Sequence, residues 1–385
     1  MHMFLNLCAL ACWMVFTSST AWAQEDLEQS SDPEFTSHTG GCFDTPVFGA
    51  NTPRVRITFF PQRKNRGLRA QLLNRRQISE PLAWLAEQQR KDGSWRWINP
   101  NQTPSYSPFT PDQFNKDIAA TSLALLSLSA DGNSISAGEY SLQVKKGLGW
   151  LRSIQEWKSG EIANATEVNA LSSHALATQA LTEMYFYSKS PLVKRNTQRA
   201  VLYSLNAQIP WSAWPCTNAE ELKPDALTTA WMTQALLLAD GCKFLIPRAA
   251  YTSAIEWLEP SATQKSTEAI WLYFNVVYPF PKTPTAITEH PLFPLLDVVA
   301  KSQSLVPPKD LNEMSFRELQ EEYFLSQALF QWGGPNWTKH YQTLSQNFQS
   351  TATFPSPTLN PAIIALQTLI LQTPTRYNRI YSVLE

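Results

Sequence analysis

Polar and aromatic side chains that could bind a ligand or move a proton recur at the starts of the apolar segments of this chain. Carboxylates, imidazole and phenol are the groups that proteins use as general acids and bases. An aromatic ring beside them adds the apolar surface that a binding pocket needs. The candidates of this kind are Asp117, His174, Asp225, Trp231, Glu268, Glu321, Glu322, Tyr323 and Asn360.

These residues also have a structural interpretation, which stays open at this point. Asp and Asn are preferred N-caps of helices, and Glu is favoured in the first helical turn, so Asp117, Asp225 and Asn360 fit capping roles. His174 is harder to explain as a cap because it lies inside the apolar-rich segment 171–181. It is either a core histidine with satisfied hydrogen bonds or a ligand contact, and it is the best single candidate for a site residue.

The cysteines do not indicate a metal site or a disulfide framework. Beyond the first apolar run the chain has Cys42, Cys216 and Cys242, with no paired C-x-x-C and no Cys/His cluster at the spacing of zinc ligands. Cys216 and Cys242 would flank a helix, which puts them roughly 20 Å apart, too far for a disulfide. We therefore expect no metal and no cofactor.

Apolar segments with helical spacing position the candidate residues. Ala, Leu and Thr recur in them at intervals of three and four, and Pro and Gly fall between them. We expect helices over residues 117–128, 170–187, 225–239, 267–277, 321–331 and 360–371. Each would pair with a helix that precedes it, which gives an all-α fold of about six helical hairpins.

A sequence repeat precedes these helices. Its first unit has Trp84-Leu85, then Gln89, then Gly93 and Trp95. Later units keep parts of the pattern, and the longest gap between units is expected to hide one more. Their matching residues are Trp150, Gln155 and Gly160, then Tyr203, Gln208, Ser212 and Trp214, then Trp257, and finally Leu344 with Gln349.

This pattern, an aromatic residue, Leu, x3, Gln, x3, Gly, x, Trp, resembles the repeat of squalene-hopene cyclases and prenyltransferase β subunits. The wider chain, about residues 78 to 380, is similar to secreted bacterial prenyltransferase/squalene-oxidase repeat proteins. The resemblance implies an α/α toroid whose inner helices begin around the mouth of a central bowl. It also implies structural roles for the repeat residues Trp84, Gln89, Gly93, Trp95, Trp150, Gln155, Gln208 and Trp214.

The catalytic motifs of these relatives are missing from the chain. Cyclases protonate an alkene with a D-x-D-D run, whereas Asp117 stands alone in Asn115-Lys116-Asp117-Ile118. Prenyltransferases hold zinc with Asp, Cys and His, and no matching set accompanies Cys216 and Asp225. The Cys-Gly-Glu-Gln thioester motif of complement-type relatives is also absent.

The N-terminal part of the chain indicates export. The apolar run from Phe4 to Phe16 leads to Ala21-Trp22-Ala23, a small-x-small cleavage signature, so residues 1–23 are predicted to be a signal peptide cut after Ala23. A leader over 24–45 and a basic arm over 46–78 would precede the toroid domain at 79–385. The basic residues between 54 and 76 either contact an acidic surface or form an ordinary solvated strap.

The overall charge of the chain limits the class of partner it is expected to bind. The 31 basic and 32 acidic side chains nearly cancel, which argues against nucleic acid. We therefore expect a secreted or periplasmic, non-enzymatic protein that binds a small apolar or amphipathic ligand, or a protein or cell-surface partner, in the bowl or at its rim. The alternative is an enzyme that acts on an isoprenoid, or on a glycan through acids that line the bowl.

Overall fold

The computed structural model describes residues 76–98, 110–164, 167, 169–217, 223–259, 268–277, 293–305, 308–351 and 359–376. Within these ranges the chain forms 13 α-helices and no β-strand, which confirms the predicted all-α class. Of these helices, none is both long enough and apolar enough to cross a membrane. The predicted signal peptide and leader, Cys42 and nearly all of the basic arm lie outside the described residues.

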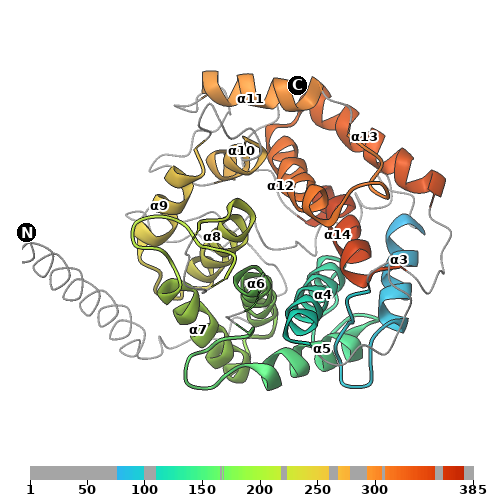
Figure 1. Cartoon of the computed structure of the whole chain (residues 1–385). Helices are drawn as coiled ribbons and strands as arrows, with labels where there is room; N and C mark the ends of the chain where they lie inside the picture. Colours follow the sequence, from blue (N-terminus) through green and yellow to red (C-terminus); the bar gives the residue numbers. More distant parts are fainter. Residues whose placement is uncertain are drawn as a thin grey trace, which may run out of the picture.

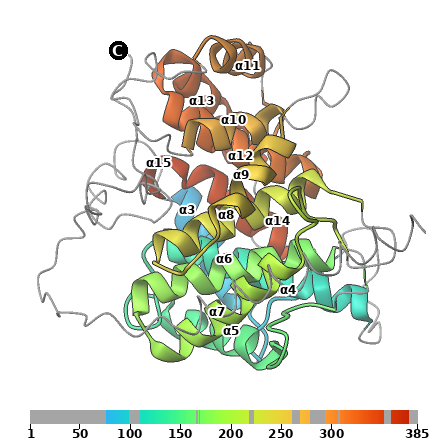
Figure 2. The same ribbon diagram turned by 90° about the vertical axis from the view of Figure 1, so that its left-hand side faces the viewer.

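The helices alternate along the chain between an inner and an outer position (Figure 1). The inner helices are α4 (Pro111–Ala130), α6 (Ala170–Ser188), α8 (Ala226–Gly241), α10 (Glu268–Val277), α12 (Phe316–Trp332) and α14 (Pro361–Leu371). The outer helices are α3 (Arg76–Glu87), α5 (Ser141–Ile154), α7 (Pro191–Asn206), α9 (Arg248–Trp257), α11 (Phe293–Leu305) and α13 (Gly334–Thr351). A short helix, α15 (Thr373–Arg376), follows α14 and lies towards the left-hand edge of Figure 2.

The difference between the two layers follows from their sequences. Every residue of α8 from Leu227 to Ala239 is buried, as a helix with neighbours on all sides requires. By contrast, α5 buries only Val144, Gly147, Leu148 and Leu151, the i, i+3, i+4, i+7 stripe of a helix with one face on the core and the other in water. The same stripe recurs on α7 and α9.

Extensive packing links α4 to α6 and α6 to α8 on one side of the molecule, and α10 to α12 on the other. The last inner helix, α14, packs on the first, α4. The outer helix α11 lies in the longest gap between recognised repeat units, where one further unit is expected from the sequence.

The repeat glutamines join neighbouring units. The side-chain amide of Gln89 donates to Gly93 O and to Gln143 O of the next hairpin, both at 2.9 Å. Gln155 and Gln208 make the equivalent pair of bonds in their own units. Each glutamine therefore closes its own turn and ties it to the chain around the start of the next outer helix.

The glycine of the repeat is needed for a close approach of backbones. Gly93 has a φ of +98°, and a Cβ added there would lie 2.4 Å from Lys146 O on α5. Gly160 has a φ of +84° and would meet Arg199 O on α7 at 2.2 Å. A side chain at either position would push the next outer helix away and strain the turn.

Two predicted helix starts are wrong. Thr110 caps α4 and Pro111 is its first residue, so Asp117 lies well inside the helix and does not cap it. Helix α12 begins at Phe316 behind a capping box, in which Ser315 and Glu318 bond reciprocally. Glu321, Glu322 and Tyr323 therefore lie in its second turn. Asp225 and Asn360 are N-caps, as the structural interpretation expected.

Candidate functional site

A pocket of about 230 Å³ lies between the N-terminal parts of α4, α6, α8 and α12. Segments that are far apart in the sequence therefore meet at one volume. Its lining residues are Trp97, Lys116, Ala119, Asn169, Ser172, Ser173, Leu176, Asp225, Leu227, Phe316, Arg317 and Gln320. Among the candidates named from the sequence, Asp225 is the one that lines it.

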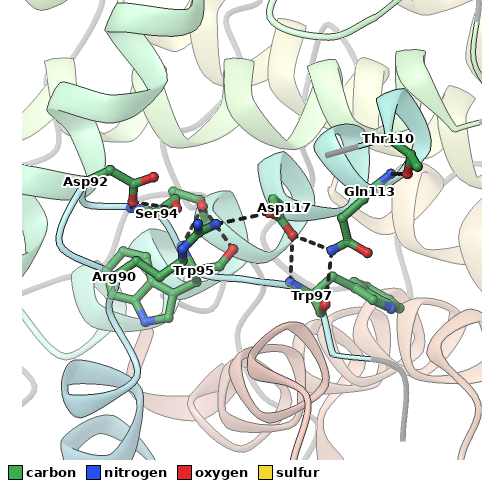
Figure 3. Close-up of polar contacts among 9 residues, drawn as sticks. Arg90, Asp92, Ser94, Trp95, Trp97, Thr110, Gln113 and Asp117 are labelled. Atoms are coloured by element: carbon green, nitrogen blue, oxygen red, sulfur yellow. Dashed lines mark hydrogen bonds and ion pairs between the residues drawn. The ribbon is translucent and has the colours of Figure 1, made fainter. Parts of the chain in front are cut away.

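Trp97 forms a fixed aromatic wall of this pocket. Its backbone is held at both ends, since its N–H donates to Asp117 Oδ1 at 2.8 Å and its carbonyl accepts from Gln113 Nε2 at 3.0 Å (Figure 3). Its ring meets Phe316 of α12 edge to face, with ring centroids 4.7 Å apart. Trp97 thus bridges the first and fifth of the inner helices.

Asp117 acts through Trp97 and does not line the pocket. Besides Trp97 N–H, its Oδ1 accepts from Gln113 Nε2 at 2.7 Å, and its Oδ2 lies 3.5 Å from Arg90 Nη1 (Figure 3). Burial raises the pKa of the Asp117 carboxyl, and these hydrogen bonds and the Arg90 charge oppose the rise. All of its described contacts hold the segment around Trp97, so Asp117 is a positioning residue.

Charged side chains from α8 and α12 meet at the rim of the pocket. Arg317 Nε donates to Glu321 Oε1 at 3.2 Å, while Arg317 Nη1 lies 4.0 Å from Asp225 Oδ1. Asp225 Oδ2 is engaged separately, by Thr228 N–H and Thr228 Oγ1, both at 2.8 Å. Burial raises the pKa of Glu321, and the charge of Asp225 adds to the rise while Arg317 opposes it.

His174 lies in the core between α6 and α7. It is fully buried, its Nδ1 accepts from Ile162 N–H at 3.2 Å, and its Nε2 lies 3.0 Å from Ala200 O. Since Nδ1 accepts, the ring hydrogen belongs on Nε2, which donates to the carbonyl. Burial lowers the pKa of His174 to about 4, so the ring is neutral at pH 7.

The position of His174 repeats from unit to unit. Thr121 Oγ1 accepts from Trp95 N–H at 2.9 Å, and Thr229 Oγ1 accepts from Trp214 N–H at 3.1 Å. His174 does the same for Ile162, which occupies the place of those tryptophans in the second unit. This favours the core interpretation of His174, the alternative that the sequence left open.

Glu322 also turns away from the pocket. It is buried, and its Oε1 accepts from Ser326 Oγ at 2.6 Å and lies 2.7 Å from Nε2 of the buried His340 on α13. Its contacts therefore join α12 to the outer layer.

Tyr323 and Trp231 belong to an aromatic cluster among the inner helices. Their rings stack with centroids 4.9 Å apart, and both side chains are fully buried. The indole of Trp231 donates to Gln320 Oε1 at 2.7 Å, and Gln320 itself lines the pocket. The cluster therefore contacts the lining residue Gln320 and does not itself line the pocket.

Two remaining candidates lie at helix starts outside the pocket lining. Asn360 Oδ1 accepts from Ala362 N–H at 3.0 Å, so its side chain caps α14. Glu268 is the first residue of α10 and is half-buried.

Much of the lining is formed by residues that the sequence did not point to, namely Trp97, Phe316, Arg317 and Gln320. The last three could have been found from the capping box Ser315-x-x-Glu318, which moves the start of α12 back to the correct turn. No comparable signal marks Trp97, because it lies in a loop and depends on a contact with Phe316, which is far away in the sequence.

Metal and disulfide sites have no support in the described ranges. No group of three or more His, Cys, Asp or Glu residues there could hold a metal ion. Cys216 and Cys242 are free, and burial raises the pKa of Cys242 to about 12, which keeps its thiol protonated.

Comparison with protein-family models, with curated proteins and with solved structures finds no match to the chain.

Proposed function

We propose that the chain is a secreted, non-enzymatic binding module built as an α/α toroid, which takes a small amphipathic ligand into the pocket at the starts of its inner helices. The alternation of inner and outer helices and the packing of α14 on α4 support a closed ring. Secretion rests on the cleavage signature before Gln24.

The main support for this proposal is that side chains from helices far apart in the sequence converge on one pocket. Capping residues need serve only their own helices, whereas the pocket collects side chains from four inner helices and from the loop that carries Trp97. An aromatic wall held by its backbone, with hydroxyl, amide and charged groups around it, is the composition of a preformed ligand site.

The enzyme alternative is less favoured by the same geometry. A glycosidase needs two carboxyl groups on opposite sides of its substrate, about 5 to 9 Å apart. Among the described acids only Asp225 lines the pocket, and Glu321 lies on the same side, bound to the same arginine. Asp117, the acid that would have to protonate an isoprenoid, is engaged by Trp97 and Gln113.

Binding of a neutral fluorescent amphiphile tests the proposal. Prodan, a small naphthalene ketone, should bind the purified protein with a blue-shifted emission. Trp97→Ala should weaken its affinity about tenfold, the loss expected from removing an aromatic contact. Trp211→Ala is the matched control, because Trp211 is 76% exposed and lies outside the pocket.

Unfolding curves for both variants separate lost binding from lost folding. Equal prodan affinity in the wild type and in a folded Trp97→Ala variant would refute the pocket as the binding site.

A further inference from the structure

We propose that the natural ligand of the pocket is a neutral ring polyol, a single saccharide-type ring, whose hydroxyl groups bridge Asp225 and Arg317 while an apolar face of the ring lies on Trp97. This rests on the proposed function and deepens it, because it names the chemical class of the ligand.

The size of the pocket limits the guest to a small, compact molecule. Pockets for drug-sized ligands typically have volumes of about 300 to 1,000 Å³. At about 230 Å³, this pocket suits one ring with its substituents, or at most two fused rings, better than an extended isoprenoid chain or an oligomer.

The gap between Asp225 and Arg317 favours hydroxyl groups. Asp225 Oδ1 and Arg317 Nη1 are 4.0 Å apart, well beyond the usual N–H···O distance of about 2.9 Å. Polar groups at such a separation are suited to a bridging group that both donates and accepts. A hydroxyl does both, so one hydroxyl or an adjacent pair can donate to the carboxylate and accept from the guanidinium.

Neighbouring side chains hold the Asp225 carboxylate and the Arg317 guanidinium in place. Thr228 fixes the carboxylate through Oδ2 and leaves Oδ1 facing Arg317. Glu321 fixes the guanidinium through Nε and leaves Nη1 facing Asp225. Ser172 extends the polar side, since its Oγ lies 2.6 Å from Thr228 Oγ1 and it also lines the pocket.

The charges around the pocket favour a neutral guest. Each lining cation already has an acidic partner, because Lys116 pairs with Asp112 at 2.6 Å and Arg317 pairs with Glu321. The N-termini of α8 and α12 are capped by Asp225 and Ser315. An anionic ligand would thus find each lining cation already paired, and a cationic ligand at Asp225 would lie beside the Arg317 guanidinium, so either charge is disfavoured.

Trp97 supplies the apolar half of the site. A sugar ring has polar edges and faces of C–H groups, so it can bury one face on an aromatic ring while its hydroxyls reach the rim. The indole ring packs edge to face on Phe316, with ring centroids 4.7 Å apart, and Asp117 and Gln113 hold its backbone. The wall therefore needs little ordering when a ligand binds.

Displacement of prodan from the full protein tests the ligand class. Glucose, N-acetylglucosamine and myo-inositol are the neutral probes, and glucuronic acid and glucosamine are charged rings of the same size. At least one neutral probe should displace prodan, and both charged rings should bind at least about tenfold more weakly than the best neutral one.

Asp225→Asn should weaken binding of the neutral probe about tenfold, because the amide has one accepting oxygen where the carboxylate has two. Asn is as good an N-cap as Asp, so α8 stays capped. Asp297→Asn on α11 is the control, because it also removes a carboxylate from an ion pair, here with Lys301.

Each result is decisive. Prodan binding that depends on Trp97, with no displacement by any neutral ring, would leave the proposed function standing and overturn the ligand class. Stronger displacement by a charged ring would also overturn it. Failure of prodan itself to bind would remove the proposed function and this inference together.

Discussion

The ion pairs at the two ends of the inner helices differ in distance and in exposure to solvent. At the N-terminal end, Asp225 and Arg317 face each other across 4.0 Å with side chains 28% and 56% exposed. Near the C-terminal ends of α6 and α14, Glu183 and Arg376 meet at 2.6 Å with no exposure at all, and Ser129 Oγ donates to the same carboxylate at 2.6 Å.

The contrast indicates that one end of the inner helices can bind a ligand, whereas the other end stabilises the fold. A loose, half-exposed pair is worth little to stability and can exchange its partner for a ligand hydroxyl. A tight, fully buried pair cannot exchange partners, because leaving either charge alone in the interior is costly. The N-terminal end of the inner helices is therefore suited to binding, and the other end fastens α15 to α6.

The largest effect is expected when the buried ion pair between Glu183 and Arg376 is broken. Arg376→Met leaves Glu183 buried without its cation and should lower the free energy of unfolding by about 3 to 5 kcal/mol. Adding Glu183→Gln should restore much of the loss, since no buried charge then remains. Urea unfolding followed by circular dichroism measures both, and prodan affinity of the folded variants should equal that of the wild type. If Arg376→Met lowers the free energy of unfolding by less than about 1 kcal/mol, the buried ion pair does not stabilise this end of the molecule.

The next effect tests whether His174 belongs to the core rather than to the pocket. Its pKa is about 4 in the folded state and about 6.5 when unfolded, so the unfolded chain binds more protons between these values. The stability that neutral His174 contributes is present above pH 6.5 and is lost as the pH falls towards 4, by about 3 kcal/mol.

His174→Thr supplies the control, because Thr occupies the equivalent place in the neighbouring units. The difference in unfolding free energy between the wild type and this variant should shrink on acidification from pH 7 to pH 4. Carboxylates common to both proteins cancel from the difference. A difference that stays constant with pH would mean that His174 is exposed to solvent.

The smallest effect concerns the cap at the open end. Asp225→Ala removes the acceptor of Thr228 N–H and should lower the free energy of unfolding by about 1 kcal/mol, whereas Asp225→Asn should change it by only a few tenths. Thermal unfolding of the pair measures this. A loss of 3 kcal/mol or more in Asp225→Ala would assign the residue to the core and weaken the contrast between the two ends.

The fold class and the repeat were predictable because they depend on local patterns. Apolar residues at helical spacing predicted α6 and α8 nearly to their observed bounds. Gln89 and Gln155 each donate to the carbonyl of the glycine in their own turn, four and five residues further on, so this part of the repeat spacing reflects a local contact.

The pocket was less predictable because its lining residues come from helices far apart in the sequence, which meet only through packing. Helical periodicity shows that a residue lies on an inner helix, but it does not show which way the side chain points. His174 and Glu322 lie near the starts of inner helices and turn outward, to α7 and α13. Gln320, two residues before Glu322 on α12, turns inward to the pocket and to Trp231.

The packing of α14 on α4 also has a consequence for how the molecule is made. Gln372 donates to Ser127 O across 245 positions of sequence, so α4 meets its last neighbour only when almost the whole described chain exists. At about 5 to 20 residues per second, ribosomal synthesis takes roughly 10 to 50 s to cover that interval. During that time the apolar side of α4 that α14 will cover lacks its partner, and transiently exposed apolar surface of this kind is prone to aggregate.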